Sequence, residues 1–221
     1  MQASLPADGP VRRRPVQQRS QERVERILDA CAVLLDEVGH GGLTTKAIAL
    51  RAGVPIGTLY QFFPNLQGLL GALAHRNLEQ YIDRLARRTE AERPAHIGAL
   101  VDLAVEEYVA MRRALPGFGV VDFGLVGGDD SGSIHLLDAV LDNNAAVAER
   151  LWVFGADLLA PGAPGAGQDR SAVRTAMRVA LECADAVLRL AFRTDPQGDL
   201  ALIAECKRLL RGYLGGEARR E

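Results

Sequence analysis

The sequence predicts an all-α protein of about nine helices. No segment sustains the alternation of apolar and polar residues that strands require, whereas long segments rich in Ala, Leu, Arg and Glu repeat their apolar residues at helical spacing. The 221 residues are 48% apolar and 24% charged, which is ordinary for a globular protein with a buried core. We therefore expect helices throughout.

The first 18 residues are rich in Pro, Gly, Arg and Gln and show no periodicity, so we expect a flexible basic arm over 1–18. A first helix follows, which Ser20 can cap and whose apolar residues between Val24 and Val38 fall on one face. The stretch "GHGG" at 39–42 should end that helix, as glycine commonly does.

Two short helices joined by a tight turn are expected next, over about 45–52 and 55–62. Thr44 or Thr45 can cap the first of them with a side-chain oxygen. Gly53 lies between the two helices and can adopt the positive φ that a tight turn requires.

The second short helix should begin at Pro55, because the restricted φ of proline suits the first helical turn. Two helices joined by a short turn containing glycine form a helix-turn-helix, and the preceding helix supplies the surface on which they pack. We therefore expect a three-helix helix-turn-helix domain over 19–65.

Residues 66–221 are expected to form a second helical domain. Asn65 can cap a long helix whose apolar residues keep helical spacing from Leu66 to Leu85. The charged stretch "RRTEAERP" at 87–94 is expected to break this helix.

Another helix is expected from Ile97 to Met111. The stretch 115–133 is rich in glycine yet apolar, which is typical of a kinked helix or a packed loop. Asp195 and Pro196 would supply the cap and the first residue of the final helix. Beyond residue 133 we expect helices over 134–160, 170–192 and 196–214, with a loop at 161–168.

The formal net charge of −2 is unevenly distributed along the chain. Residues 1–76 contain nine Lys and Arg against six Asp and Glu, a net +3, whereas residues 77–221 contain 17 against 22, a net −5. A basic first third joined to an acidic remainder suggests that only the first part contacts a polyanion.

Residues 27–70, "ILDACAVLLDEVGHGGLTTKAIALRAGVPIGTLYQFFPNLQGLL", resemble the DNA-binding domain of the tetracycline-repressor (TetR) family. The resemblance rests on these features: the helix that ends in Gly39, the pair Thr44-Thr45, "IA" at 48–49, "AGV" at 52–54, "GTLY" at 57–60 and the aromatic pair before the next helix. It implies a DNA-binding domain whose second short helix enters the major groove.

The resemblance also implies which residues contact double-stranded DNA. Lys46 suits the O6 and N7 atoms of guanine, and Gln61 suits the N6 and N7 atoms of adenine. The implied backbone contacts are Thr45, Thr58 and Tyr60, the implied base contacts are Lys46, Ile56, Gly57 and Gln61, and the arm residues Arg12, Arg13, Arg14 and Arg19 could add phosphate or minor-groove contacts.

Two positions depart from the family pattern. Pro55 stands where the family commonly has a capping serine, and Leu66 stands where it commonly has a lysine that grips a phosphate. They motivate an alternative, in which the helix-turn-helix has lost DNA binding and serves as an interaction or small-molecule-binding module.

The last two expected helices have apolar stripes interspersed with alanines. A repressor that reads a palindromic operator presents two recognition helices about 34–36 Å apart, and therefore needs two-fold symmetry. Members of the family form homodimers through their last two helices, although these stripes could instead be internal core. The resulting candidates for the dimer interface are Val173, Ala176, Ala180, Ala184, Leu188, Ile203 and Leu210.

The resemblance implies an effector pocket between the long fourth helix and the terminal helices. Its lining would be mostly apolar and aromatic, which favours a small, largely apolar or amphipathic effector. The candidates, each of which could be a plain core residue, are Tyr81, Tyr108, Met111, Phe118, Val121, Phe123, His135, Trp152 and Phe154. We expect a ligand-responsive repressor that a small effector releases from its operator.

Catalytic and metal sites are not indicated. The chain has no phosphate-binding glycine loop and no nucleophile signature, so neither an enzyme nor a cofactor is expected. Cys31, Cys183 and Cys206 are widely separated in apolar patterns and are expected to be reduced core thiols. Without a signal peptide or a run of roughly 18 apolar residues, a cytoplasmic protein is expected, with no membrane contact.

Overall fold

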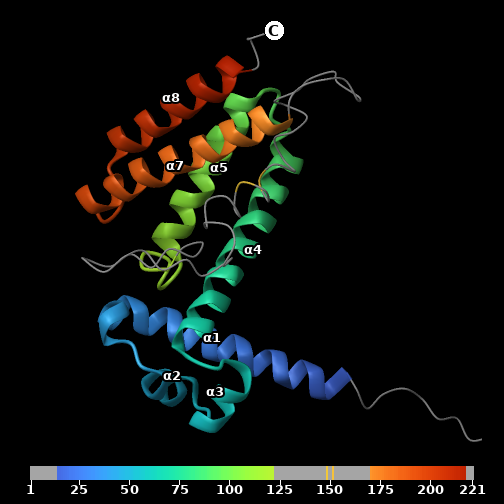
Figure 1. The fold of residues 1–221 in the computed structure, drawn as a ribbon, viewed down its shortest axis with the longest axis vertical. Helices are drawn as coiled ribbons and strands as arrows, with labels where there is room; N and C mark the ends of the chain where they lie inside the picture. The colour runs from blue at the N-terminus through green and yellow to red at the C-terminus, as the bar shows by residue number, and fades with distance from the viewer. Residues whose placement is uncertain (1–13, 122–147, 149–150, 152–169, 218–221) are drawn as a thin grey trace, which may run out of the picture.

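A computed structural model of the chain describes residues 14–121, 148, 151 and 170–217 (Figure 1). The all-α prediction is confirmed, since this part of the chain contains helices and no strand. The prediction of about nine helices exceeds the seven found there, and the expected helix 134–160 and the loop 161–168 lie almost wholly outside it. The helices are α1 (Arg14–Gly42), α2 (Thr45–Ala52), α3 (Ile56–Phe62), α4 (Leu66–Glu92), α5 (Ile97–Ala114), α7 (Arg170–Thr194) and α8 (Leu200–Glu217).

The first unit, which we call the head, consists of α1, α2, α3 and the first turns of α4. Its core is built on Ile27, Ile48, Leu59 and Leu69, whose side chains are completely buried. Residues of α4 as far as Ala74 belong to the same core, so α4 starts inside the head.

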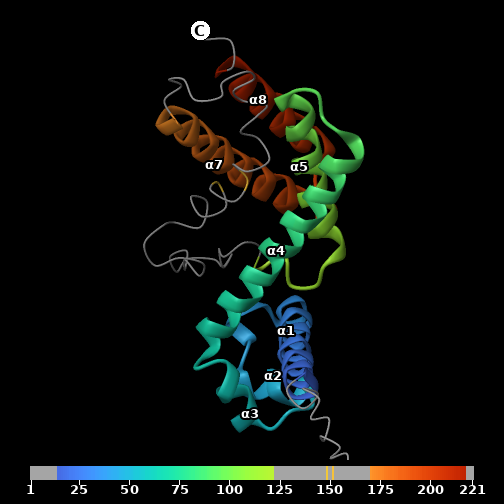
Figure 2. The same cartoon turned by 90° about the vertical axis from the view of Figure 1, so that its right-hand side faces the viewer.

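The second unit, which we call the body, consists of the remainder of α4 together with α5, α7 and α8. Helices α7 and α8 lie side by side, α5 packs against α8, and α4 packs against α5 (Figures 1 and 2). The body core includes Leu78, Leu85 and Met111, each at most 2% exposed. Helix α4 therefore runs without interruption from the head core into the body core.

A second connection joins head and body through residues 115–121, which we call the 115–121 turn. Phe118 is fully buried in the body core, where its ring meets that of Tyr108 edge-on at 5.5 Å, whereas Val121 is fully buried in the head core. Asn77 of α4 donates a hydrogen bond from Nδ2 to the Val121 carbonyl at 2.8 Å. The turn thus inserts side chains only three positions apart into two different cores.

Gly117 allows this turn to lie against α1. Its φ of +70° is in the left-handed region, and its N–H donates to Asp36 Oδ1 at 2.8 Å. A Cβ atom at this position would lie 2.6 Å from the carbonyl oxygen of Ala32. Glycine is therefore required by both backbone conformation and space.

Helix α1 begins earlier than expected. It starts at Arg14 and not at Ser20, so residues 14–18 of the expected arm are helical. Pro15 is tolerated because the first turn of a helix needs no hydrogen bond from its N–H groups, and the Gln and Arg residues that follow are good helix formers. The expected break at Gly39 is present as non-helical dihedral angles, φ 65° and ψ 179°, although helical turns resume as far as Gly42.

Helix α4 continues into the stretch 87–94, which was expected to break it, and ends within that stretch. Arg88 and Glu92 lie one turn apart and form an ion pair at 2.9 Å, which supports the helix at this point. The helix ends at Glu92, and Arg93 adopts a left-handed conformation with φ 46° immediately before Pro94. The break therefore falls inside the expected stretch but only near its end, because charged residues at helical spacing stabilise the helix as far as Glu92.

Helix α8 begins at Leu200, four residues later than expected. The Asp195 carboxylate accepts a hydrogen bond from the N–H of Gln197 at 2.7 Å, so it closes a local turn and does not cap the helix. Gly198 continues that turn with φ 83°, and Asp199 caps the helix by accepting from the N–H of Leu202 at 2.9 Å. The sequence analysis named Asp195 as the cap, whereas the structure uses Asp199.

Candidate nucleic-acid interface

Side-chain and backbone caps hold α2 and α3 in the expected helix-turn-helix. Thr44, one of the two candidates, caps α2 by accepting a hydrogen bond from the N–H of Ala47 at 3.1 Å. Gly53 ends α2 in the left-handed conformation, with φ 64°. Asn65 caps α4 as expected, since its Oδ1 accepts from the N–H of Gly68 at 2.7 Å.

Helix α3 is anchored on one side and exposed on the other. Leu59 is completely buried and Phe63, just past the helix, is 6% exposed, so this face is held in the head core. Ile56 is 42% exposed and Tyr60 50% exposed on the outer side. The implied base contacts are all exposed: Lys46 on α2, and Ile56, Gly57 and Gln61 on α3.

Thr45 and Tyr60 come together although they are 15 positions apart in the chain. Thr45 Oγ1 on α2 and Tyr60 Oη on α3 form a hydrogen bond of 3.1 Å. Thr58, the third implied backbone contact, is half-buried on the same helix as Tyr60. Hydroxyl groups both donate and accept, so the Thr45–Tyr60 pair can receive a phosphate oxygen while remaining bonded to each other. Sequence reasoning assigned both residues to the DNA backbone but did not predict their bond.

Gly57 is not required by the fold. A Cβ atom built there meets no protein atom within 4 Å, and its φ is not in the left-handed region. The open space on this side of α3 is where a ligand outside the protein could approach the backbone.

The two departures from the family pattern have local explanations. Pro55 occupies the cap position of α3, with φ −58° and ψ 141°, and not its first turn as expected. Its side chain makes no cap bond, but its carbonyl accepts from the N–H of Thr58 at 2.9 Å. Leu66 is partly buried against the head core, so this position makes an apolar contact there.

Sequence reasoning missed Leu50, which is 84% exposed on α2. It lies four residues after Lys46, and residues at that spacing share one face of a helix. The four-residue spacing from Lys46 could have identified Leu50 from the sequence. An exposed leucine beside a candidate base contact is able to touch a base methyl group or a sugar.

The basic arm is only partly described. Arg19 is exposed on α1, and Arg14 is the first residue of that helix, while Arg12 and Arg13 lie outside the described residues. The N-terminal end of α1 extends past α2 and α3 (Figure 1).

The candidate effector residues are divided between the two cores. Tyr81, Tyr108, Met111 and Phe118 are buried in the body core, whereas Val121 is buried in the head core. The Tyr81 hydroxyl donates to the carbonyl of Ala104 at 3.0 Å, and burial, followed by the charge of Glu107, raises the pKa of this tyrosine. The candidates outside the described residues are Phe123, His135, Trp152 and Phe154.

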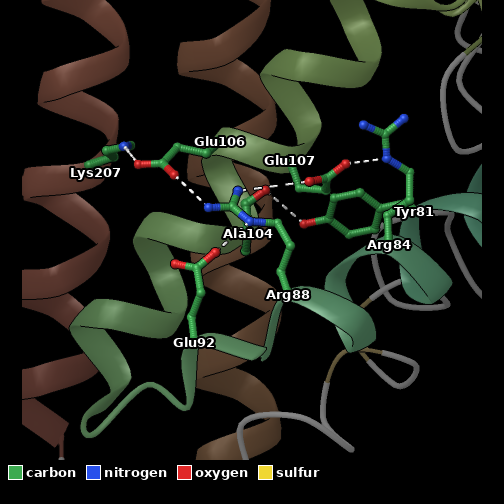
Figure 3. A network of polar contacts seen from close by, with 8 residues as sticks. All are labelled: Tyr81, Arg84, Arg88, Glu92, Ala104, Glu106, Glu107 and Lys207. Atoms are coloured by element: carbon green, nitrogen blue, oxygen red, sulfur yellow. Dashed lines mark hydrogen bonds and ion pairs between the residues drawn. The ribbon is translucent and has the colours of Figure 1, made fainter. Parts of the chain in front are cut away.

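A charged network that sequence reasoning missed lies beside Tyr81 (Figure 3). Glu107 on α5 is 5% exposed and pairs with Arg84 of α4, and more distantly with Arg88 at 3.7 Å. Arg88 also contacts Glu106 at 3.0 Å, and Glu106 in turn contacts Lys207 of α8 at 2.7 Å. The network ties α4, α5 and α8 together.

Most of the candidate dimer residues face the core of their own chain. Val173 and Ala184 are half-buried, and Ala176, Ala180, Leu188, Ile203 and Leu210 are buried in the body core. The same two helices expose other apolar side chains, namely Val179, Leu190, Leu200 and Leu209, which are 39%, 38%, 75% and 44% exposed. These four side chains are apolar surface that α7 and α8 leave exposed within the described residues.

The described residues offer neither a metal-binding cluster nor a membrane-spanning helix. Residues 14–121 and 170–217 contain no cluster of three or more His, Cys, Asp or Glu able to hold a metal ion. The helices observed there are too short or too polar to cross a membrane.

Two protein-family models match the chain. The model "Bacterial regulatory proteins, tetR family" covers residues 27–73, and "Tetracyclin repressor-like, C-terminal domain" covers residues 95–218, more than half of the chain. The first match includes α2, α3 and the start of α4, and the second includes α5, α7 and α8.

Solved structures and curated proteins give the same picture. A TetR-family transcriptional regulator from Streptomyces coelicolor is 40% identical, with a TM-score of 0.72 over 88% of this chain and 98% of that one. An HTH-type transcriptional regulator of Mycobacterium tuberculosis is 32% identical over 93 residues, 41% of this chain and 48% of the relative. The repressor KstR of Rhodococcus jostii is 39% identical over 64 residues, 29% of this chain and 30% of KstR. The chain thus spans about half or less of the length of these curated relatives.

Proposed function

Because the chain belongs to the TetR family of bacterial transcriptional regulators, we propose that it is a homodimeric repressor that binds a palindromic operator and leaves it when a small molecule binds. Relatives named as repressors, among them KstR and the class D tetracycline repressor of Escherichia coli, support repression over activation. The protein acts on cytoplasmic DNA and carries out no catalysis.

The observation that carries this proposal is the outer surface of α2 and α3. It presents the Thr45–Tyr60 hydroxyl pair, a cationic side chain at Lys46 and an amide at Gln61. Gly57 has no side chain that would block access to the backbone of α3. Hydroxyl groups hold phosphates, and Lys and Gln read base edges. A surface with these groups side by side is suited to the major groove.

Each group has a distinct role in the proposed complex. Thr45, Thr58 and Tyr60 hold the DNA backbone, so they set the register without reading sequence. Lys46 and Gln61 read bases, and Ile56 and Leu50 offer apolar contact to thymine methyl groups or sugars. The backbone at Gly57 approaches the DNA closely because no side chain intervenes.

The basic residues at the N-terminal end add phosphate contacts. Arg14 and Arg19 lie on the projecting end of α1, and Arg12 and Arg13 precede it. Each neutralised phosphate releases a counterion, so the affinity falls as salt rises. These contacts compensate for the phosphate contact of the lysine that the family commonly has where this chain has Leu66.

The second copy packs on the outer side of α7 and α8. Val179 and Leu190 of α7 and Leu209 of α8 supply exposed apolar area there. Association of two such helix pairs buries these side chains and places one head on each half of the operator.

The effector binds in the body, among residues such as Tyr81, Tyr108 and Met111. Because this lining is largely apolar, a small apolar or amphipathic molecule suits it. The effector favours a dimer whose heads are spaced or oriented wrongly for both half-sites, and the DNA affinity falls by the ratio of the effector's affinities for the two states. Helix α4, which belongs to both cores, conveys the change.

Selection from a randomised duplex library tests the DNA-binding function. We expect the purified dimer to enrich a palindrome, with log affinity falling steeply against log salt concentration. When the selected duplex is known, Lys46→Ala and Gln61→Ala should each weaken the preference for one base at one position of each half-site.

The alternative, a helix-turn-helix that has lost DNA binding, predicts no enrichment even at low salt. Leu66 and Pro55 motivate this alternative, but the packing of Leu66 on the head core gives that residue a structural role that is compatible with DNA binding. The matched control is Arg208→Ala, an exposed change on α8 that should leave the selected sequence and its affinity unchanged.

A further inference from the structure

A cavity lies where the head meets the body, apart from the proposed effector pocket. Its volume is about 360 Å³, and it is bounded by α1, the end of α5, the 115–121 turn and the end of α7. The lining residues used below are Asp36, Arg112, Arg113, Leu115, Phe192 and Pro196.

Two consecutive arginines reach this cavity. The Arg112 guanidinium lies over the ring of Phe192, with its central carbon 5.0 Å from the ring centroid. A Cβ atom at Gly119 would lie 3.6 Å from that carbon, so the guanidinium also lies close to the backbone of the 115–121 turn. Arg113 donates from Nε to the carbonyl of Gln197 at 2.7 Å, which orients its other two nitrogens.

These arginines differ from others in the protein. Arg51, Arg76, Arg84, Arg88 and Arg211 each contact a carboxylate. Within residues 14–121 and 170–217, neither Arg112 nor Arg113 has a carboxylate within ion-pair distance. Two oriented cationic forks at one cavity, both without an acidic partner there, are suited to an anion.

The opposite wall limits the charge of that anion. Asp36 is the acidic side chain among the lining residues, and its Oδ1 already accepts the N–H of Gly117. Two arginines and one aspartate give the lining a net charge of +1, which a single negative charge balances. Leu115, Phe192 and Pro196 add apolar surface against which a flat group can pack.

We propose that this cavity is a second ligand site, which binds a small monocarboxylate carried on a flat apolar group. The carboxylate pairs with Arg112 and Arg113, and the apolar part packs on the proline and leucine side chains. A ligand there touches α1 of the head and α5 and α7 of the body together, so it restricts their relative movement. This regulatory consequence rests on the proposed function, whereas the binding itself does not.

Calorimetric titration of the full chain with benzoate, in the absence of DNA and at low salt, tests the site. We expect saturable binding with a dissociation constant on the order of 1 mM. Benzamide, which has the same shape without the charge, and acetate and inorganic phosphate, which lack the flat apolar group, should each bind at least about tenfold more weakly.

Variants locate the site. Arg112→Gln with Arg113→Gln should raise the benzoate dissociation constant at least about tenfold, and Arg113→Gln alone, at an exposed residue, should raise it in part. Arg193→Gln is the matched control, because Arg193 is exposed on α7 but does not line the cavity. Circular dichroism checks that each variant is folded.

Three results would overturn the proposal: no saturation up to about 10 mM, equal binding of benzamide or phosphate, or benzoate binding unaffected by both arginine changes. The last result would place benzoate elsewhere, for example in the body. Because DNA is absent, none of these outcomes depends on whether the protein proves to be a repressor.

Discussion

Tyr60 shows how a single hydroxyl group can serve two neighbours. It bonds to Thr45 across the space between α2 and α3 and is half exposed to solvent. A phosphate would add a hydrogen bond to an already oriented hydroxyl, so less conformational entropy is lost on binding.

Tyr60→Phe should therefore weaken DNA binding without changing sequence preference. Loss of one hydrogen bond to a charged phosphate costs about 1.5 kcal/mol, roughly a tenfold loss of affinity, at every duplex tested. Fluorescence anisotropy with the selected palindrome and with substituted versions of it measures this.

Thr45→Val is the companion change, since it removes the other hydroxyl at nearly constant shape and should weaken all duplexes in the same way. If either variant shifts the preferred sequence, then the assignment of this pair to the DNA backbone is wrong.

Replacing two glycines of the chain by alanine should change the free energy of unfolding in opposite directions. At Gly117 the added Cβ meets the Ala32 carbonyl and the φ is +70°, so Gly117→Ala should lower the free energy of unfolding by about 2–3 kcal/mol. At Gly57, within α3, the Cβ meets nothing, so Gly57→Ala should raise it by up to about 1 kcal/mol.

Urea denaturation followed by circular dichroism measures both glycine variants. Gly57→Ala should at the same time weaken DNA binding, because the new methyl group lies on the proposed DNA surface. A stabilised Gly117→Ala variant would show that the 115–121 turn does not press on α1 as described.

At the scale of helices, the charged network adds to the apolar packing that holds α4 to the body. Glu107 is nearly buried while Arg84 and Arg88 are 36% and 29% exposed, so the network is partly screened by solvent. Glu107→Gln should lower the free energy of unfolding by about 1–3 kcal/mol, less than for a fully buried pair. Glu92→Gln, at the exposed edge of the same network, is the control and should cost below about 1 kcal/mol.

The network also makes the free energy of unfolding depend on pH in the acidic range. The hydrogen bond from Lys207, and then the one from Arg88, lowers the pKa of Glu106 below its usual range. The resulting stabilisation is complete above the ordinary glutamate pKa of about 4.3 and is lost as the pH falls through the lowered value. Lys207→Gln should therefore flatten the decline in stability below about pH 4. Urea midpoints across that range measure the effect, and an unchanged slope would contradict it.

The start of α4 could be predicted because a single capping side chain directly precedes its apolar pattern. Asn65 is the one polar residue before α4 and it caps as expected. Before α8 two aspartates, Asp195 and Asp199, compete, and the choice depends on the conformation of Gly198, which has no signature in sequence. The extension of α1 to Arg14 was missed because the composition of a disordered arm and that of a solvated helix overlap.

At the scale of the whole molecule, the sequence could not show which side of α7 and α8 packs in the body core and which is exposed. Both helices have small and apolar residues on more than one side, so the stripe through Ala176 and Leu188 was expected at the dimer interface and lies in the body core. By contrast, the clustering of the candidate DNA contacts on α2 and α3 was predictable, because these residues occur in one short segment. The position of Val121 in the head core and the pairing of Glu107 arise from contacts distant in sequence.

The outer side of α7 and α8 gives a prediction for assembly. Val179→Asp with Leu209→Asp should weaken the dimer at least about 30-fold, because each carboxylate would be buried without a partner. Sedimentation velocity across protein concentration measures the change, and operator affinity should fall with it. Leu50→Asp, an equally apolar exposed position on the head, should leave the dimer intact.

The 115–121 turn has a further consequence for how such proteins can be recombined. Because Val121 fills part of the head core and its carbonyl is held by Asn77, the head does not contain all of its own packing. A fragment that ends after α4 lacks this side chain and would carry a void. A chimera that exchanges DNA specificity between relatives must therefore take two separate segments from the same parent protein. These are the residues up to Asn77 and the 115–121 turn.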